Sequence, residues 1–281
     1  SCKVQEQYEQ NPYPRWVNLQ LPPFPKTIST ITKELNLKIS NLDIDKVDTP
    51  QILIAGCGTG EHSIATASMF KNCDVLAIDL SLSSLAYAKR KTEELGISNI
   101  EYMQADILDL KILNRKFDII ECNGVLHHMD DPMAGWKVLT DCLKIEGLMK
   151  IGLYSELARS GVVKIQNEIE KSNIESSYSA MKSFRNKIIN SKEEHHKWIA
   201  MVSDFYSMST LQDLLFHVQE RRFTIPQIDA SLTQLGLVFC GFENKKSLYD
   251  LEKWDTFEKE NPRTFVTMYQ FWCQKEGKKT V

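Results

Sequence analysis

The stretch QILIAGCGTG, residues 51–60, decides the fold of this chain. Its first half is a short apolar run that predicts a buried strand, and its second half is a glycine-rich turn before a predicted helix at 61–71. Glycines let the backbone turn tightly and approach a ligand without interference from Cβ atoms. The turn amides and the helix N-terminus favour a carboxylate or a phosphate. Because Gly60 comes one residue too early for the G-x-G-x-x-G fingerprint, the spacing disfavours a dinucleotide pyrophosphate.

Apolar runs alternate with amphipathic segments over most of the remaining chain. We predict further strands at 75–78, 100–104, 117–122, 147–154, 237–242 and 264–273. We predict helices at 82–95 and 133–143, and another that begins after the N-cap Thr224 and ends at Gly236. This rhythm predicts an α/β fold with a doubly wound, mostly parallel seven-stranded sheet covered by helices on both faces.

The same pattern predicts how the chain is divided. Residues 48–155 and 224–274 should form the α/β core, and residues 1–47 an N-terminal aromatic segment and helix that cover the ligand site. Residues 156–223 are charged and favour helix, so they predict a helical insertion after the fifth strand, and 275–281 a polar tail. Because open α/β sheets bind ligands at this edge, we expect the insertion to help form an acceptor pocket; the alternative is a purely structural excursion.

Composition excludes several classes of function. The chain has 34 basic and 37 acidic residues, a balance that predicts no nucleic-acid partner. Its seven cysteines form no C-x-x-C pair, which disfavours a zinc site or a disulfide framework and predicts reduced thiols in a cytoplasmic protein. The sequence contains no apolar run of membrane-spanning length and no signal peptide, so we expect no membrane partner. The oligomeric state is left open.

Two aspartates follow predicted strands and suit an adenosine ligand. Asp79 ends the second strand, where a carboxylate can accept both ribose hydroxyls; the alternative is a cap for the helix that starts near Ser81. Asp106 ends the third strand and could accept from the adenine amino group, with the Ile107 backbone N–H beside it; the alternative is a turn or cap role.

The fourth strand leads into a histidine pair, His127 and His128, followed by Asp130 and Asp131. Adjacent side chains rarely converge on one ion, and no third ligand stands at motif spacing, so we predict no metal. A general base is the better interpretation for His128, because an unperturbed imidazole titrates near working pH.

Four segments together resemble the class I S-adenosylmethionine-dependent methyltransferases, in the order of that family: residues 52–60, 78–81, 105–107 and 117–128. The resemblance implies a Rossmann-like methyltransferase fold with S-adenosyl-L-methionine as cofactor and S-adenosyl-L-homocysteine as product. The cofactor-binding residues that it implies are Gly56, Cys57, Gly58, Gly60, Asp79, Leu80, Asp106, Ile107, Asn123 and Gly124. Ile54 departs from the family, most of which has an acid there that helps to bind the methionine amino group, so another polar group must do this.

Residues 7–16 and 213–220 resemble bacterial methyltransferases that often follow tetratricopeptide repeats. That resemblance fits a chain that begins at Ser1 and is one module of a longer protein.

Acceptor binding is expected from the N-terminal segment, the fourth-strand loop and the insertion. Asp213 and His217 are four residues apart and should share a helix face, with His217 as a second candidate base and an arginine for a carboxylate. The predicted substrate-binding residues are Tyr13, Arg15, Trp16, His128, Tyr154, Tyr206, His217 and Arg221. The alternatives are that residues 8–16 only anchor the N-terminus and that 213–222 form an exposed, salt-bridged helix. We expect His195 and His196 to be solvated.

These features predict transfer of a methyl group from S-adenosylmethionine to O or N of a peptide, a protein side chain or a small carboxylate-bearing metabolite. Two other functions remain open. A non-catalytic module that binds the cofactor is compatible with Ile54, and a nicotinamide-dependent oxidoreductase is compatible with the fold but not with the glycine spacing.

Overall fold

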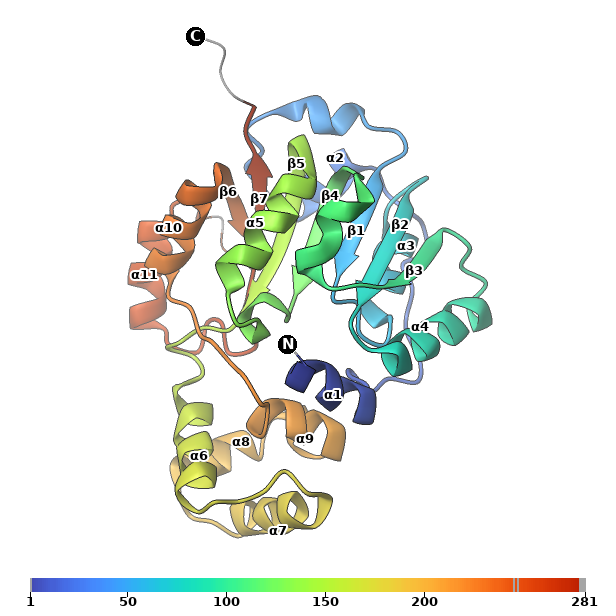
Figure 1. The fold of residues 1–281 in the computed structure, drawn as a ribbon. Coiled ribbons are helices and arrows are strands. Elements are labelled where there is room, and N and C mark those ends of the chain that lie inside the picture. Colours follow the sequence, from blue (N-terminus) through green and yellow to red (C-terminus); the bar gives the residue numbers. More distant parts are fainter. Residues whose placement is uncertain (1, 245, 247, 278–281) are drawn as a thin grey trace.

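The computed structural model describes residues 2–244, 246 and 248–277. Its strands are β1 (Gln51–Ala55), β2 (Asp74–Asp79), β3 (Ile100–Gln104), β4 (Phe117–Asn123), β5 (Leu143–Leu153), β6 (Leu237–Phe242) and β7 (Tyr269–Lys275). They form one seven-stranded sheet in the order β3–β2–β1–β4–β5–β7–β6 (Figure 1). All pairings are parallel except those of β7, which is antiparallel to both of its neighbours. The predicted fold class is confirmed.

Helices bury both faces of the sheet. One face carries α5 (Pro132–Cys142), α10 (Ile225–Leu235) and α11 (Leu251–Glu260), and the other carries α2 (Ile28–Glu34), η1 (Leu42–Lys46), α3 (Glu61–Met69) and α4 (Leu82–Glu94). Along β1, Leu53 and Ala55 belong to the first core and Ile52 and Ile54 to the second. Because side chains of a strand alternate between the faces, a strand that is covered twice reads as an uninterrupted apolar run.

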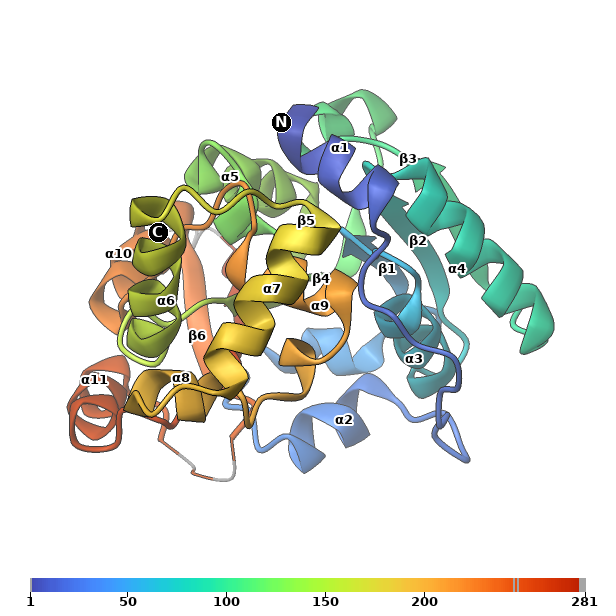
Figure 2. The same ribbon diagram turned by 90° about the horizontal axis from the view of Figure 1, so that it is seen from below.

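The insertion forms a helical layer with its own small core. It contains α6 (Ser160–Lys171), α7 (Tyr178–Ile189), α8 (Glu194–Ile199), η4 (Ser203–Phe205) and α9 (Met208–Leu215). Figure 1 shows it below the carboxyl ends of the strands, and Figure 2 shows α7 and α9 across that edge. The chain leaves and returns at one point, since Phe223 N donates to Tyr154 O (2.9 Å) and Glu156 N to Phe223 O (2.9 Å).

Helix α1 (Cys2–Gln10) lies between the insertion and the core (Figure 1). Gln5 Nε2 donates to Leu80 O at 3.0 Å on the core side, and Val218 N donates to Gln7 Oε1 at 3.2 Å on the other side. The N-terminal segment therefore joins two parts of the chain that are far apart in sequence.

Two predictions in the C-terminal part are wrong. The last strand begins at Tyr269 rather than Thr264, and α11 precedes it where no helix is predicted. The apolar character of this region has another cause: Phe265 packs on the buried Trp254 and on Phe242 from a loop (ring centroids 5.5 and 4.7 Å). The predicted polar tail starts late, because Lys275 still belongs to β7, and its residues 278–281 lie outside the described residues.

The prediction of solvated histidines at 195 and 196 is also wrong for His196, which is 3% exposed. The Nε2 atoms of His195 and His196 lie 2.6 and 2.9 Å from the two carboxylate oxygens of Glu168 on α6. The charged sequence KEEHHK does not indicate that His196 is buried against Glu168, because this glutamate lies on another helix.

Candidate active site

A cavity of about 660 Å³ opens at the carboxyl ends of the parallel strands. Its lining includes the glycine turn after β1, residues at the ends of β2, β3 and β4, and residues from α1 and α9. This is the edge at which open α/β sheets bind their ligands. All ten residues predicted to bind the cofactor line it except Gly60.

The backbone conformation of the turn after β1 favours glycine at three positions. Gly56, Gly58 and Gly60 have φ values of +78°, +51° and +89°, in the region where a side chain is strained. A Cβ atom at Gly58 would also clash with the backbone carbonyl of Tyr13, and one at Gly56 with Val125. Gly60 does not line the cavity; it is the N-cap residue of α3.

Asp79 and Asp106 each accept hydrogen bonds from backbone N–H groups and also line the cavity, so the capping role and the ligand-binding role left open by the sequence are compatible. Asp79 accepts from Gly58 N (2.8 Å) and Ser81 N (2.9 Å), and Asp106 accepts from Leu108 N (2.9 Å) at the start of η2 (Ile107–Leu113). Both carboxylates also line the cavity, and each oxygen has a further lone pair for a ligand. Burial raises the pKa of Asp79, although these backbone donors favour its charged form.

The strand next to Ile54 carries a buried acid. Glu121 on β4 is in register with Ile54, so both side chains lie on the same face of the sheet. Glu121 is 1% exposed and contacts His62 Nε2 and Thr66 Oγ1 (3.0 Å for the threonine). Burial opposes its charge, but His62, Lys150 and Thr66 outweigh this and hold the pKa of Glu121 below its ordinary value.

Two oxygens at this end have no partner. Among the described residues, Glu121 Oε1 and Asn123 Oδ1 are buried and accept no hydrogen bond. His62 and Asn123 both line the cavity, and their side chains lie 3.4 Å apart. His62 and Glu121 were not predicted from the sequence; the available signal was an acid inside the apolar run of β4.

The N-terminal segment is fastened to the glycine turn. Trp16 Nε1 donates to Thr59 O (3.2 Å) and Thr59 Oγ1 donates to Pro14 O (2.6 Å). Tyr13 lines the cavity as predicted, but Trp16 and Arg15 do not. Trp16 is buried behind the turn and Arg15 is exposed, because the Thr59 contacts direct the chain away from the cavity after Pro14.

At the opposite end, residues from α1 and α9 form a hydrogen-bonded chain. Tyr8 Oη donates to Asp213 Oδ1 (2.8 Å), and His217 Nε2 lies 3.1 Å from Tyr8 Oη. Gln219 N donates to His217 Nδ1 (3.1 Å), so the His217 proton is on Nε2 and both ring nitrogens are engaged. The predicted shared helix face is wrong, since α9 ends at Leu215. His217 lies beside the lining, and Asp213 lies in it.

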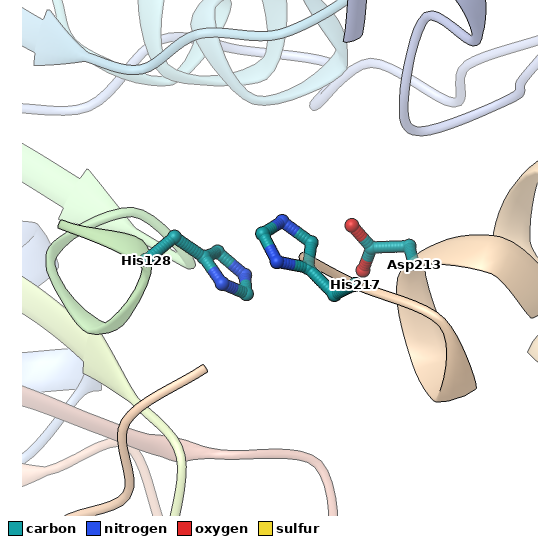
Figure 3. A group of neighbouring side chains, drawn as sticks. All are labelled: His128, Asp213 and His217. Carbon is teal, nitrogen blue, oxygen red and sulfur yellow. The ribbon is translucent and has the colours of Figure 1, made fainter. Parts of the chain in front are cut away.

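His128 stacks on His217, with ring centroids 3.6 Å apart and planes at 19° (Figure 3). Its Nδ1 donates to Gln219 O (2.7 Å), which leaves the Nε2 lone pair free. Burial and the neighbouring histidines lower its pKa well below the ordinary value, so His128 is a neutral imidazole. Asp213 completes a group of possible metal ligands, but stacked rings direct their in-plane lone pairs along nearly parallel lines rather than at one ion.

Two predicted acceptor residues lie elsewhere. Tyr206 is 58% exposed and donates to Ala200 O (2.7 Å), while Arg221 is exposed and donates to Asp130 O (2.6 Å). Neither lines the cavity, so the prediction that Arg221 receives a carboxylate there is wrong. The base of the insertion instead buries Arg159, which sequence analysis missed. Arg159 forms a bidentate pair with Glu220 (3.0 and 2.6 Å).

Tyr154 lines the cavity as predicted. Its ring stacks on His127 at 3.9 Å and lies 3.6 Å from the Arg159 guanidinium carbon. The guanidinium therefore covers one part of this tyrosine while remaining paired with Glu220.

Among the described residues, the carboxylates that line the cavity are not balanced by basic side chains of lysine or arginine. Within the part of the chain that the structure describes, its lining has no lysine and no arginine. The acidic residues of the lining are Glu61, Asp79, Asp106, Asp130, Asp131 and Asp213.

Comparison with known proteins agrees with this geometry. Residues 52–147, from β1 to the middle of β5, match the family described as methyltransferase domain. These residues therefore form a methyltransferase domain, and the strand order is that of the class I, S-adenosylmethionine-dependent methyltransferase fold. The match does not include α1, the insertion or the last two strands of the methyltransferase fold.

Relatives of the methyltransferase domain share parts of this chain. A protein of Synechococcus sp. is 36% identical over 43% of this chain, and a malonyl-[acyl-carrier protein] O-methyltransferase of Acetivibrio thermocellus is 27% identical over 46%. These alignments span 29% and 44% of the relatives' own lengths.

Solved structures share the methyltransferase fold over a larger part of the chain. PKMT2 from Rickettsia typhi, in complex with AdoHcy, has a TM-score of 0.62 at 18% identity and covers 91% of this chain and 55% of its own. An S-adenosylmethionine-dependent methyltransferase from Clostridium acetobutylicum has a TM-score of 0.52 at 17% identity and covers 89% and 90%. None of the described helices is long and apolar enough to cross a membrane.

Proposed function

We propose that this protein binds S-adenosylmethionine in the cavity and transfers its methyl group to a nitrogen or oxygen of a peptide, a protein side chain or a small molecule. The observation that carries this proposal is the convergence of the glycine turn, Asp79 and Asp106 on one cavity of the methyltransferase domain. A carboxylate-bearing metabolite is disfavoured, because no lysine or arginine of the described residues lines the cavity.

The residues of the cavity fit the cofactor. Asp79 would accept from the ribose hydroxyls, and Asp106 with the Ile107 N–H would receive the adenine. Asn123 and His62 line the cavity, and Glu121 lies behind His62, outside the lining; the unpartnered oxygens of Asn123 and Glu121 suit a cationic amino group and would replace the acid that Ile54 lacks. Bound in this way, S-adenosylmethionine supplies an electrophilic methyl group on a sulfonium.

The contribution of this chain to the reaction is mainly alignment and exclusion of water. Tyr8 and Tyr13 cover the cavity from the N-terminal segment, and Asp213 closes it from the insertion. His128 Nε2 is an imidazole nitrogen of the lining with a free lone pair that can accept a proton, but its depressed pKa means that it would pass the proton on rather than hold it.

Calorimetry and labelled methyl transfer test the proposal. We expect S-adenosylhomocysteine to bind with micromolar-range affinity, and radiolabelled methyl groups from S-adenosylmethionine to enter the protein or small-molecule fraction of a lysate. Binding without transfer would favour the non-catalytic module. Tight NADH binding without a response to S-adenosylhomocysteine would favour the oxidoreductase.

The Glu121→Gln variant tests the methionine end of the site. We expect S-adenosylhomocysteine to bind about tenfold more weakly, since a charged hydrogen-bond network loses its charge while its shape is kept. Calorimetry should be run beside Glu101→Gln, an exposed glutamate on β3 that lies outside the cavity. Equal affinities for the two variants would contradict the role proposed for Glu121.

A further inference from the structure

We propose that the methyl acceptor is a primary or secondary amine, which enters as its ammonium ion and binds among Tyr8, Tyr13, Tyr154 and Asp213. This inference rests on the proposed function and names its acceptor class. The four residues, which we call the acceptor chamber, come from α1, the segment after it, the end of β5 and α9.

The charge of the lining selects a cation. An anionic acceptor would meet six acidic side chains and no lysine or arginine among the described residues of the cavity. Asp79 and Asp106 suit the neutral hydroxyl and amino groups of adenosine, whereas Asp213 lies on the side of the insertion. The electrostatic field therefore favours a positively charged acceptor.

In the described part of the chain, Asp213 is the acid of the lining that is buried without a counter-ion. It is 5% exposed, and its side chain accepts a hydrogen bond from the neutral hydroxyl of Tyr8. Among the described residues, no lysine, arginine or histidine nitrogen lies within 4.0 Å of its oxygens in an ion pair; the nearby Arg159 is paired with Glu220. Buried charges are normally paired, so an ammonium ion would complete this site.

The surrounding rings suit the same ligand. Tyrosine faces attract cations, and Tyr8 and Tyr13 line the chamber; the ring of Tyr154 is already stacked on His127 and covered by Arg159, so it contributes its edge. Burial, with Asp213 nearby, raises the pKa of Tyr8 and Tyr13, so these phenols stay neutral and can donate hydrogen bonds. Burial also raises the pKa of Asp213 to about 6, which reflects the cost of leaving this carboxylate unpaired.

Transfer to the amine requires one deprotonation. The ammonium loses a proton to His128 Nε2, and from there to solvent. The freed nitrogen lone pair forms the new bond to the methyl carbon as the carbon–sulfur bond breaks. The electron pair of that bond stays on sulfur, which gives S-adenosylhomocysteine and a methylammonium product.

A binding experiment tests the chamber without turnover. Thermal unfolding of the protein saturated with S-adenosylhomocysteine should shift upward with n-butylammonium chloride, but not with 1-butanol or sodium butyrate at equal ionic strength. Asp213→Asn should weaken butylammonium binding by at least about tenfold, because it removes a charged partner. The control Glu175→Gln changes an exposed acid of the same insertion outside the lining and should bind like wild type.

The stability of Asp213→Asn shows whether the variant is folded. Because the folded-state pKa of Asp213 is raised, the native protein binds this proton more tightly than the unfolded chain, and its stability contribution is lost as pH rises through about 6. The groups that act on Asp213 are Tyr8, Arg159, Glu220 and Asp204. We expect the variant to unfold at a higher temperature than wild type at pH 8, with a smaller gap at pH 4.

Labelled methyl transfer separates this inference from the proposed function. Label should enter an untreated lysate and fall to background when its amines are acetylated beforehand; the fractions show whether protein or small amines accept it. Transfer that survives acetylation, or butylammonium binding unchanged in Asp213→Asn, would overturn the amine while leaving methyl transfer intact. Absence of S-adenosylhomocysteine binding would instead overturn the proposed function.

Discussion

Asp79→Ala is expected to weaken S-adenosylhomocysteine binding by roughly a hundredfold, the largest effect on ligand binding that the site predicts. The proposed pair of hydrogen bonds from the ribose hydroxyls to a carboxylate would be lost. The same change removes the acceptor for Gly58 N and Ser81 N, which hold the glycine turn and the start of α4 in place. Isothermal titration calorimetry measures the affinity directly.

Two further variants make the Asp79 result interpretable. Asp109→Ala removes an acid from η2 that does not line the cavity, and it should bind the ligand like wild type. Asp79→Asn keeps the shape of the side chain and should fall between wild type and alanine. An affinity of Asp79→Ala within about threefold of wild type, with the protein folded, would refute the ribose assignment.

Arg159→Met is expected to lower the free energy of unfolding by about 3–5 kcal/mol, the largest effect on stability. Arg159 and Glu220 are each only 4% exposed at the side chain, so the variant leaves a buried carboxylate without its bidentate partner. The loss should appear in urea unfolding followed by circular dichroism. Arg222 lies 3.4 Å from Glu220 and only partly compensates its charge, so Arg159→Met combined with Glu220→Leu should recover much of the loss, because the buried carboxylate is gone.

The exposed pair Arg115–Glu101 is the matched comparison. Its side chains are 41% and 62% exposed, and Arg115→Met should cost no more than about 1 kcal/mol. If Arg159→Met were no more destabilising than Arg115→Met, the buried pair would not be holding the base of the insertion.

Local sequence patterns predicted most of the sheet and the cofactor side of the site. The β1 range and the β6 range agree with the structure residue for residue, as does the Thr224 cap of α10, which forms a capping box with Gln227. These features depend on short-range rules, namely strand burial, glycine conformation and capping. The position of Asp79 relative to the glycine turn follows equally local rules. The turn belongs to one strand–turn–helix unit, and Asp79 ends the next strand along the chain.

The acceptor side could not be predicted in the same way. The sequence selected Arg15, Tyr206 and Arg221 by residue type and position, and the structure places all three outside the cavity. Residue type alone does not say which way a side chain points when the segment is a loop or a packed insertion. The buried Arg159 is the opposite case, since its partner Glu220 is 61 residues away.

Local patterns were sufficient to predict the methyltransferase fold and the place where the cofactor is expected, because both follow from contacts between neighbours along the chain. Only the tertiary structure placed Glu121 beside Ile54, through the register of two strands, and brought Tyr8 to Asp213 across 205 residues. Such contacts form when whole layers of the fold pack together. The sequence of each segment carries no periodic pattern that identifies its distant partner. The edge of the sheet that carries the cavity could therefore be predicted from the sequence, whereas the position of Asp213, the carboxylate proposed to bind the acceptor, depends on the packing of α1 against the insertion.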